Sequence, residues 1–144
     1  MLDVKIKRLT PTATLPTYGS KFAAGMDLYA DCSEIMIPPH ETVKVGSGFS
    51  FQPPKGYCGL ILARSGLAAK QGLRPANCVG LCDEDYTGEY IVAIHNDSPY
   101  TQNILGGDRI AQLMFIPYEH VNLIEVEDLE VTERGAGGFG STGK

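Results

Sequence analysis

Three acidic residues, Asp83, Glu84 and Asp85, stand side by side and are followed at once by Tyr86. The residues around them predict a turn between a strand and a returning strand. Crowding raises the pKa of one carboxyl in such a group, and carboxylates also assemble cation sites. The segment therefore indicates a general base or a Mg2+ locus, with a merely solvated turn as the alternative.

A second segment, Arg64-Ser65-Gly66, combines groups that bind phosphate. It stands where the apolar run from Tyr57 to Leu62 gives way to helix-forming residues. A guanidinium, a hydroxyl and free N–H groups would then meet at the positive end of a helix. A helix cap beside a surface arginine remains the alternative.

The stretch from Arg134 to Lys144 holds five glycines and one aromatic ring, Phe139. Each glycine has much backbone freedom to lose, so this stretch holds no fixed shape alone. Its bare N–H groups, arginine and hydroxyls can wrap a phosphate-bearing ring compound. We therefore divide the chain into a β-rich domain, residues 1–133, and a mobile arm, residues 134–144. A disordered end is the alternative.

Two nucleotide fingerprints in this arm are rejected. Gly135 to Gly140 satisfies G-x-G-x-x-G, and Gly138 to Lys144 satisfies all but the last position of the P-loop pattern. Both patterns act through a preceding strand and a following helix that holds phosphate. No such helix is expected here, so neither a dinucleotide fold nor a P-loop is predicted.

Five blocks of the chain, taken in order, resemble the five motifs of the trimeric dUTP pyrophosphatases (dUTPases). The blocks are Ala24 to Ala30, Arg64 to Ala68, Gly80 to Gly88, Gly107 to Leu113 and Arg134 to Gly143. They cover nearly the whole chain. The resemblance implies a jelly-roll-like β-barrel subunit of the dUTPase-like β-clip type, and a homotrimer whose active sites draw on all three subunits.

The resemblance also implies the reaction. Members of the family hydrolyse dUTP to dUMP and pyrophosphate by Mg2+-assisted attack of water on the α-phosphorus. This activity limits the incorporation of uracil into DNA and supplies dUMP for dTMP synthesis. Such hydrolysis needs positioning and charge neutralisation more than a covalent nucleophile, which agrees with the residue types in the five blocks.

Residue roles follow from the same resemblance. Asp83 resembles the base that orients and deprotonates the water, and Tyr86 resembles the ring that leaves no room for a 2′-hydroxyl. Asp27 resembles the acidic residue that reaches the water shell of the metal. The remaining substrate-binding residues are Asn77, Gly80, Leu81, Cys82 and Ile91 for uracil, Arg64, Ser65, Gly66 and Gln112 for phosphate, and Arg134, Phe139, Gly140, Ser141 and Thr142 in the closing arm.

The chain departs from the family pattern at Met26, Ala63 and Cys82, without loss of a functional group. We expect Cys82, beside the proposed base, to make the site sensitive to oxidation. We otherwise predict that the four cysteines are small apolar core residues. Their spacing does not match a zinc site, and no secretory context supports disulfides.

Short strands must position all these residues. Alternation of apolar and polar residues opens the chain at Leu2, Val4 and Ile6, which predicts a half-buried strand. Seven further runs are expected at Ile35 to Ile37, Thr42 to Val45, Phe49 to Phe51, Tyr57 to Leu62, Glu89 to Ile94, Ile110 to Ile116 and Val121 to Val126, with turns such as Gly46-Ser47-Gly48 between them. One short helix is predicted from about Gly66 to Gln71, capped by Ser65 and ended by Gly72. The pattern is all-β.

Composition excludes several classes of protein. The 144 residues fit one domain, and 43% hydrophobic with 20% charged residues excludes wholesale disorder. A net charge of −5 is the wrong sign for a nucleic-acid binder. No apolar run approaches a membrane span, and the N-terminus lacks an apolar signal core. We expect a protein that is not secreted and that is cytoplasmic, or nuclear by diffusion if the source is eukaryotic or viral.

Two other functions compete with dUTP hydrolysis. A dCTP deaminase on the same fold would release ammonia instead of pyrophosphate. A catalytically idle trimer would act as a protein-binding or regulatory module. The acidic turn at Asp83 and the complete glycine-rich arm favour the pyrophosphatase over both.

Overall fold

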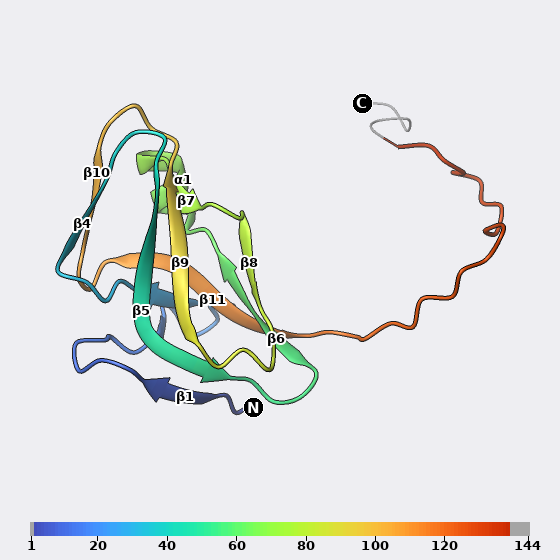
Figure 1. Cartoon of the computed structure of the whole chain (residues 1–144), viewed down its shortest axis with the longest axis horizontal. Coiled ribbons are helices and arrows are strands. Elements are labelled where there is room, and N and C mark those ends of the chain that lie inside the picture. Colours follow the sequence, from blue (N-terminus) through green and yellow to red (C-terminus); the bar gives the residue numbers. More distant parts are fainter. Residues whose placement is uncertain (1, 139–144) are drawn as a thin grey trace.

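A computed structural model describes residues 2–138 of the chain. Within this range it has one short helix and strands throughout the first 117 residues, which confirms the all-β prediction (Figure 1). The elements are β1 (Lys5–Arg8), β2 (Thr17–Tyr18), β3 (Met26–Tyr29), β4 (Glu34–Ile37), β5 (Thr42–Gln52), β6 (Tyr57–Leu62), α1 (Ser65–Gln71), β7 (Leu73–Pro75), β8 (Val79–Cys82), β9 (Glu89–Asn96), β10 (Gln102–Leu105) and β11 (Arg109–Pro117).

The strands form a jelly-roll-like arrangement of antiparallel sheets. One sheet has the order β1-β5-β9-β7, and the larger one has the order β2-β3-β11-β6-β8. A small sheet pairs β10 with β4. The turn after β8 leads into β9, so the acidic residues cross from one large sheet to the other.

Alternation along the strands builds the core. In β9, Tyr90, Val92 and Ile94 are buried while Ile91 is 45% exposed, as expected for a sheet with one face toward the core. Leu28 of β3 and Leu113 of β11 are fully buried from the other large sheet. The two sheets therefore enclose one apolar interior.

Three sequence predictions about strands are wrong. Gly46-Ser47-Gly48 is not a turn between two strands but an irregularity within β5, where the register against β9 shifts. The Glu89 carboxylate fills the space beside it and accepts the Gly48 N–H at 2.8 Å, so the long strand continues. Val121 to Val126 forms no strand, because this stretch lies beyond the barrel without a pairing partner. In the first strand Lys5–Arg8 is exposed throughout, because β1 is the edge of its sheet.

The helix also differs from its prediction at one end. It begins at Ser65, and Arg64 is the N-cap residue without a side-chain cap, so Ser65 does not cap it. At the other end Gly72 adopts the predicted left-handed conformation, with φ of 69°. Cys78 is exposed with positive φ, which contradicts its assignment to the core. Within residues 2–138, no helix is both long and apolar enough to cross a membrane.

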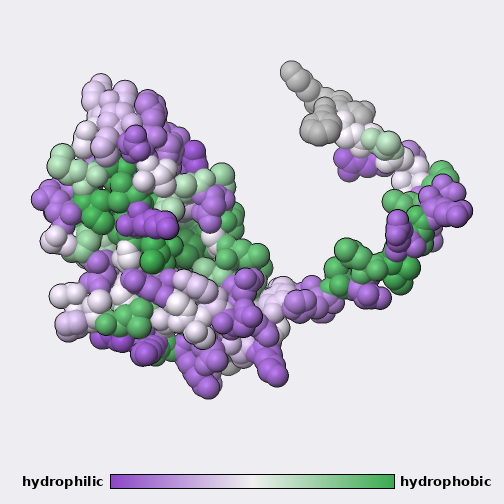
Figure 2. All heavy atoms as spheres, viewed as in Figure 1, coloured by the Kyte–Doolittle hydropathy of each residue, from purple (hydrophilic) through white to green (hydrophobic). Residues whose placement is uncertain are grey.

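Beyond β11 the chain runs away from the barrel (Figure 1). This segment is exposed almost throughout, and apolar side chains recur along it, as Figure 2 shows. They are Val121, Leu123, Ile124, Val126, Leu129 and Val131, between 55% and 100% exposed. So many exposed apolar groups mark a segment that lacks a packing partner.

Candidate active site

Three strands bring the predicted phosphate-binding residues to one place. β11 lies between β3 and β6, and Gln112 stands opposite both Asp27 and Leu62. Arg64 lies two residues after the end of β6. The Asp27 carboxylate is buried and accepts the Arg64 Nε–H at 2.9 Å, while its other oxygen lies 3.4 Å from Nη1 of Arg109. Asp27 thus holds two guanidinium groups at one end of the barrel.

This geometry adds Arg109, to which sequence reasoning assigned no role. Its side chain is 52% exposed, and a pocket of about 250 Å³ opens beside it and Arg64. The signal was present in the sequence, since Arg109 stands inside the fourth resembling block. Ser65 and Gly66 are exposed at the start of α1, and a side chain at Gly66 would meet nothing within 4 Å. This end of the barrel is therefore open and presents two guanidinium groups.

The predicted uracil-binding residues lie just before β8, along β8 itself and, for Ile91, in β9. β8 is the last strand of its sheet and pairs only with β6 in the described part of the chain. Its other edge leaves N–H and C=O groups of Gly80 to Cys82 unpaired by a ladder. These groups can match the edge of a uracil, whose donors and acceptors differ from those of cytosine.

Packing explains why a glycine stands at position 80, which the sequence did not reveal. A side chain there would come within 3.1 Å of Cβ of Ile61 and 3.5 Å of Nδ2 of Asn77. The lack of a side chain lets β8 lie close to β6 and keeps Asn77 next to the free edge. Leu81 and Ile91, at 64% and 45% exposure, lie on the outer surface of this region.

The acidic turn separates its three carboxylates by environment. Oε2 of Glu84 accepts the Gly56 N–H at 2.6 Å. This bond, with a further contribution from the Tyr118 hydroxyl, holds the pKa of Glu84 below its usual range. Crowding therefore does not raise the pKa of Glu84. Asp83 and Asp85 remain exposed, and Glu84 ties the turn to the Gly56 backbone.

The side chains on either side of Asp83 are also placed by the fold. Tyr86 is 45% exposed, and its hydroxyl donates to the Glu89 carbonyl at 3.0 Å. Burial raises the pKa of the Cys82 thiol to about 11. Little thiolate then exists at neutral pH, so the expected sensitivity of Cys82 to oxidation is not supported.

The acidic turn and the arginine cluster lie at opposite ends of β6, and β8 runs between these two levels. Cys82 stands opposite Gly59 of β6, and Arg64 lies five residues further along the chain. At about 3.3 Å per residue, roughly 16 Å separates the level of Cys82 from that of Arg64. One copy of the chain therefore keeps the acidic turn and the arginine cluster apart.

The described start of the arm, residues 134–138, makes local contacts. The Nε–H of Arg134 donates to the nearby Gly137 carbonyl at 2.8 Å. The remaining predicted arm residues lie outside the described part of the chain: Phe139, Gly140, Ser141 and Thr142. Within residues 2–138, no cluster of three or more acidic, cysteine or histidine side chains could hold a metal ion.

Known proteins share this sequence and this fold. A sequence model of dUTPase matches residues 12–143. The chain belongs to the dUTPase family. The deoxyuridine 5′-triphosphate nucleotidohydrolase of Nautilia profundicola is 44% identical over 143 residues, covering 99% of this chain and all of that protein.

Two solved dUTPase structures show how far the fold is shared. The dUTPase of Staphylococcus bacteriophage 80alpha with dUPNHPP has a TM-score of 0.91 at 28% identity, over 99% of each chain. A mutant dUTPase from phage phi11 of S. aureus, solved to describe the coordination of a structural Mg(II) ion, has a TM-score of 0.82 at 24% identity. It covers 90% of this chain and 99% of its own, and at this identity it supports the fold alone.

Proposed function

We propose that this member of the dUTPase family hydrolyses dUTP to dUMP and pyrophosphate, by attack of water on the α-phosphorus. The observation that carries the proposal is the hairpin from β8 to β9. It presents an unpaired backbone edge, then the exposed Asp83 carboxylate, then the exposed ring of Tyr86. One hairpin thus carries a base reader, a proton acceptor and a sugar contact within seven residues, Gly80 to Tyr86.

Asp83 is assigned as the group that orients the water and accepts its proton. The carboxylate of Glu84 is engaged by Gly56, which leaves the exposed Asp83 as the residue next to the reading edge. Arg64, with Gln112 beside it, would hold the phosphates and stabilise the negative charge that develops on their oxygens. Arg134 and Phe139 of the arm would close over the terminal phosphate and the base.

A magnesium ion fits these residues only as a partner of the triphosphate. The carboxylate of Asp27 lies between two arginines, where it can reach a metal through water but is not free to form a cage. Mg2+ keeps several waters and prefers phosphate oxygens, so this arrangement suits it. When bound, the ion would supply charge neutralisation on the triphosphate.

The distance between the two groups supports a homotrimer with shared sites. Asp83 would act at the α-phosphorus, and Arg64 would hold the adjoining phosphates, yet one copy separates them by roughly 16 Å of sheet. A second subunit that brings its own arginine cluster to the acidic turn would remove this gap. The exposed arm would then supply residues to a site on another copy.

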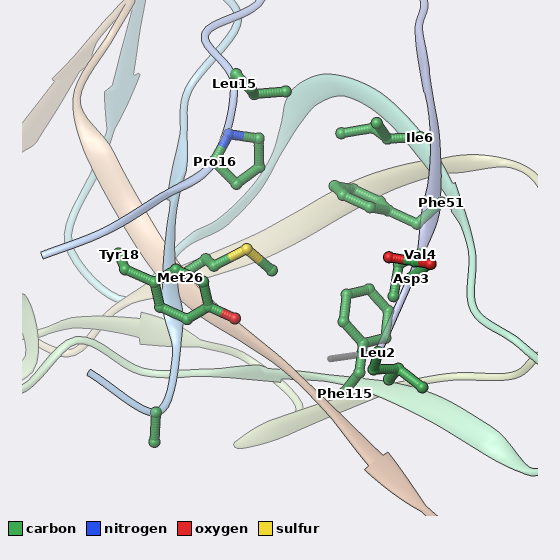
Figure 3. Close-up of a pocket in the computed structure, with 11 residues that line it drawn as sticks. Leu2, Asp3, Val4, Ile6, Leu15, Pro16, Tyr18, Met26, Phe51 and Phe115 are labelled. Atoms are coloured by element: carbon green, nitrogen blue, oxygen red, sulfur yellow. The ribbon is translucent and has the colours of Figure 1, made fainter. Parts of the chain in front are cut away.

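A surface groove supports the same assembly. It has a volume of about 650 Å³ and lies between β1 on one side and the region of β2 and β3 on the other (Figure 3). Leu2, Ile6, Leu15, Tyr18, Met26 and Phe115 are among its mostly apolar lining residues. β1 is an edge strand, so an extended apolar segment could pair with it. Residues 121–131 of a neighbouring subunit have this character.

The function is tested by the products formed from dUTP, dCTP, dTTP and UTP in the presence of Mg2+. We expect pyrophosphate from dUTP and little turnover of the other three nucleotides. Ammonia released from dCTP would instead identify a deaminase. Absence of turnover with all four nucleotides would favour the binding module.

Replacing Tyr86 by Ala tests sugar selection. The ring excludes a 2′-hydroxyl by shape, so its loss should weaken dUTP use and relax the rejection of UTP. We expect the ratio of the two kcat/KM values, dUTP over UTP, to fall by about tenfold to 100-fold. An unchanged ratio would show that the ring only packs.

The assembly is tested by light scattering on the full chain. We expect a mass about three times the 15.5 kDa of one copy. Ile124→Asp should lower this mass, because the side chain is 77% exposed in one copy and would bury its charge only in the assembly. Phe22→Asp is the matched control, since Phe22 is 88% exposed but outside both the groove and the segment. A trimer unaffected by Ile124→Asp would exclude this contact.

A further inference from the structure

The ring of Tyr86 rests against a second tyrosine that the proposed mechanism does not use. Tyr90 lies four residues later in β9, and its ring stacks on that of Tyr86 with centroids 6.0 Å apart and planes 26° apart. On its other side Tyr90 packs against Phe51 at 4.6 Å. Tyr90 is only 1% exposed, so it forms a buried support for an exposed ring.

The backbone of Gly88 contacts the Tyr86 ring from another direction, because glycine has no side chain to keep the ring away. A Cβ at Gly88 would lie 2.6 Å from the Tyr86 hydroxyl oxygen and 2.7 to 2.9 Å from two of its ring carbons. The ring therefore lies directly on the Gly88 backbone. The hydrogen bond from its hydroxyl to the Glu89 carbonyl fixes the outer end.

The site of Tyr90 is itself shaped for a large ring. A Cβ at Gly59 would lie 3.1 Å from the Tyr90 hydroxyl oxygen and 3.2 Å from a ring carbon. No hydrogen bond of ordinary geometry reaches that buried hydroxyl from the described residues. The Cys82 thiol beside it offers at most a weak partner, so a strong hydrogen bond does not explain a tyrosine here. The Tyr90 ring lies between Gly59 and Tyr86 and supports the Tyr86 ring.

Building on the proposed role of Tyr86, we propose that Tyr90 and Gly88 are positioning residues that set the selection of deoxyribose over ribose. A ring excludes a hydroxyl by shape only if it cannot move aside. Tyr86 is half exposed on a turn, where the hydrogen bond from its hydroxyl restrains only the outer end of the ring. The stack on Tyr90 and the contact with Gly88 remove that freedom, so the ring stays where a 2′-hydroxyl would collide with it.

The first test replaces the support. Tyr90→Leu removes the stacking ring, and the dUTP/UTP ratio of kcat/KM should fall by about tenfold. Tyr90→Phe keeps the ring and should keep the ratio. Ile94→Ala is the control for general loosening, since Ile94 is equally buried on the same face of β9 without contact to Tyr86. It should lower stability to thermal unfolding and leave the ratio unchanged. An unchanged ratio in Tyr90→Leu, or an equal loss in Ile94→Ala, would overturn the role of Tyr90.

The second test leaves the core intact. Gly88→Ala places a methyl group against the Tyr86 ring and should push it outward, again lowering the dUTP/UTP ratio, even if Tyr90→Leu does not fold. Tyr86→Ala in the same assay separates the two levels of the proposal. If Tyr86→Ala lowers the ratio and Gly88→Ala does not, the positioning role of Gly88 is wrong. If Tyr86→Ala leaves the ratio unchanged, the role of Tyr86 itself is wrong and the inference fails with it.

Discussion

Asp83→Asn should lower the rate of dUTP hydrolysis by a factor of about 10² to 10⁴. The amide keeps the shape of the carboxylate but cannot accept the proton of the attacking water. Binding of a non-hydrolysable dUTP analogue should survive, because the backbone edge of β8 and the arginine cluster are untouched. Single-turnover rates and analogue affinity, measured on the same preparation, separate the two effects.

Glu84→Gln is the matched control for this variant. It removes a charge from the adjacent position, yet its amide oxygen can still accept the Gly56 N–H. We therefore expect turnover close to that of the unmodified chain. If Asp83→Asn retains normal turnover while Glu84→Gln or Asp85→Asn loses it, the base has been assigned to the wrong carboxylate.

Deletion of residues 134–144 should abolish most turnover and leave folding and the trimer intact. The described start of this arm makes only local contacts, such as that of Arg134 with Gly137, so its loss removes little from the barrel. Residues 121–131, which are proposed to hold the trimer, remain. Catalysis should collapse because Arg134 and Phe139 would no longer cover the terminal phosphate and the base, and water would enter. Activity, thermal unfolding and molecular mass of the truncated chain test this prediction.

A point substitution and a protease-protection experiment test the role of the arm without removing it. Phe139→Ala should be milder than the deletion, costing on the order of 1 to 3 kcal/mol if base stacking is a fair guide. The arm should be cleaved readily by protease without nucleotide and resist cleavage with an analogue plus Mg2+, because ligand contacts offset the ordering entropy. Equal cleavage in both conditions, or full activity after trimming, would leave the arm without a catalytic role.

Local patterns in the sequence were enough to predict the elements whose causes are local. The apolar runs Tyr57 to Leu62 and Glu89 to Ile94, each bounded by turn residues, predict β6 and most of β9. Gly72 predicts the end of the helix, since few other residues adopt its left-handed conformation cheaply. The acidic turn and Arg64 could likewise be recognised as chemical groups from their residue types and order alone.

Short strands escaped prediction because their pairing is long-range. β2, β3, β7 and β10 have two to four residues each, too few for a period of two to be visible. Conversely, Val121 to Val126 has the composition of a strand but lies where this copy offers no partner. Gly46 to Gly48 reads as a turn locally, and only the Glu89 carboxylate from a distant strand holds it within β5.

The sequence alone determined which side chains could do chemistry, while the tertiary structure decided which of them are free to do it. Contacts between residues distant along the chain made that decision: Gly56 engages Glu84, and two arginines enclose Asp27. The separation of Arg64 from the acidic turn was equally hidden, since it follows from the register of β6 against β8. Such contacts depend on sheet order and register, which no local run of residues encodes.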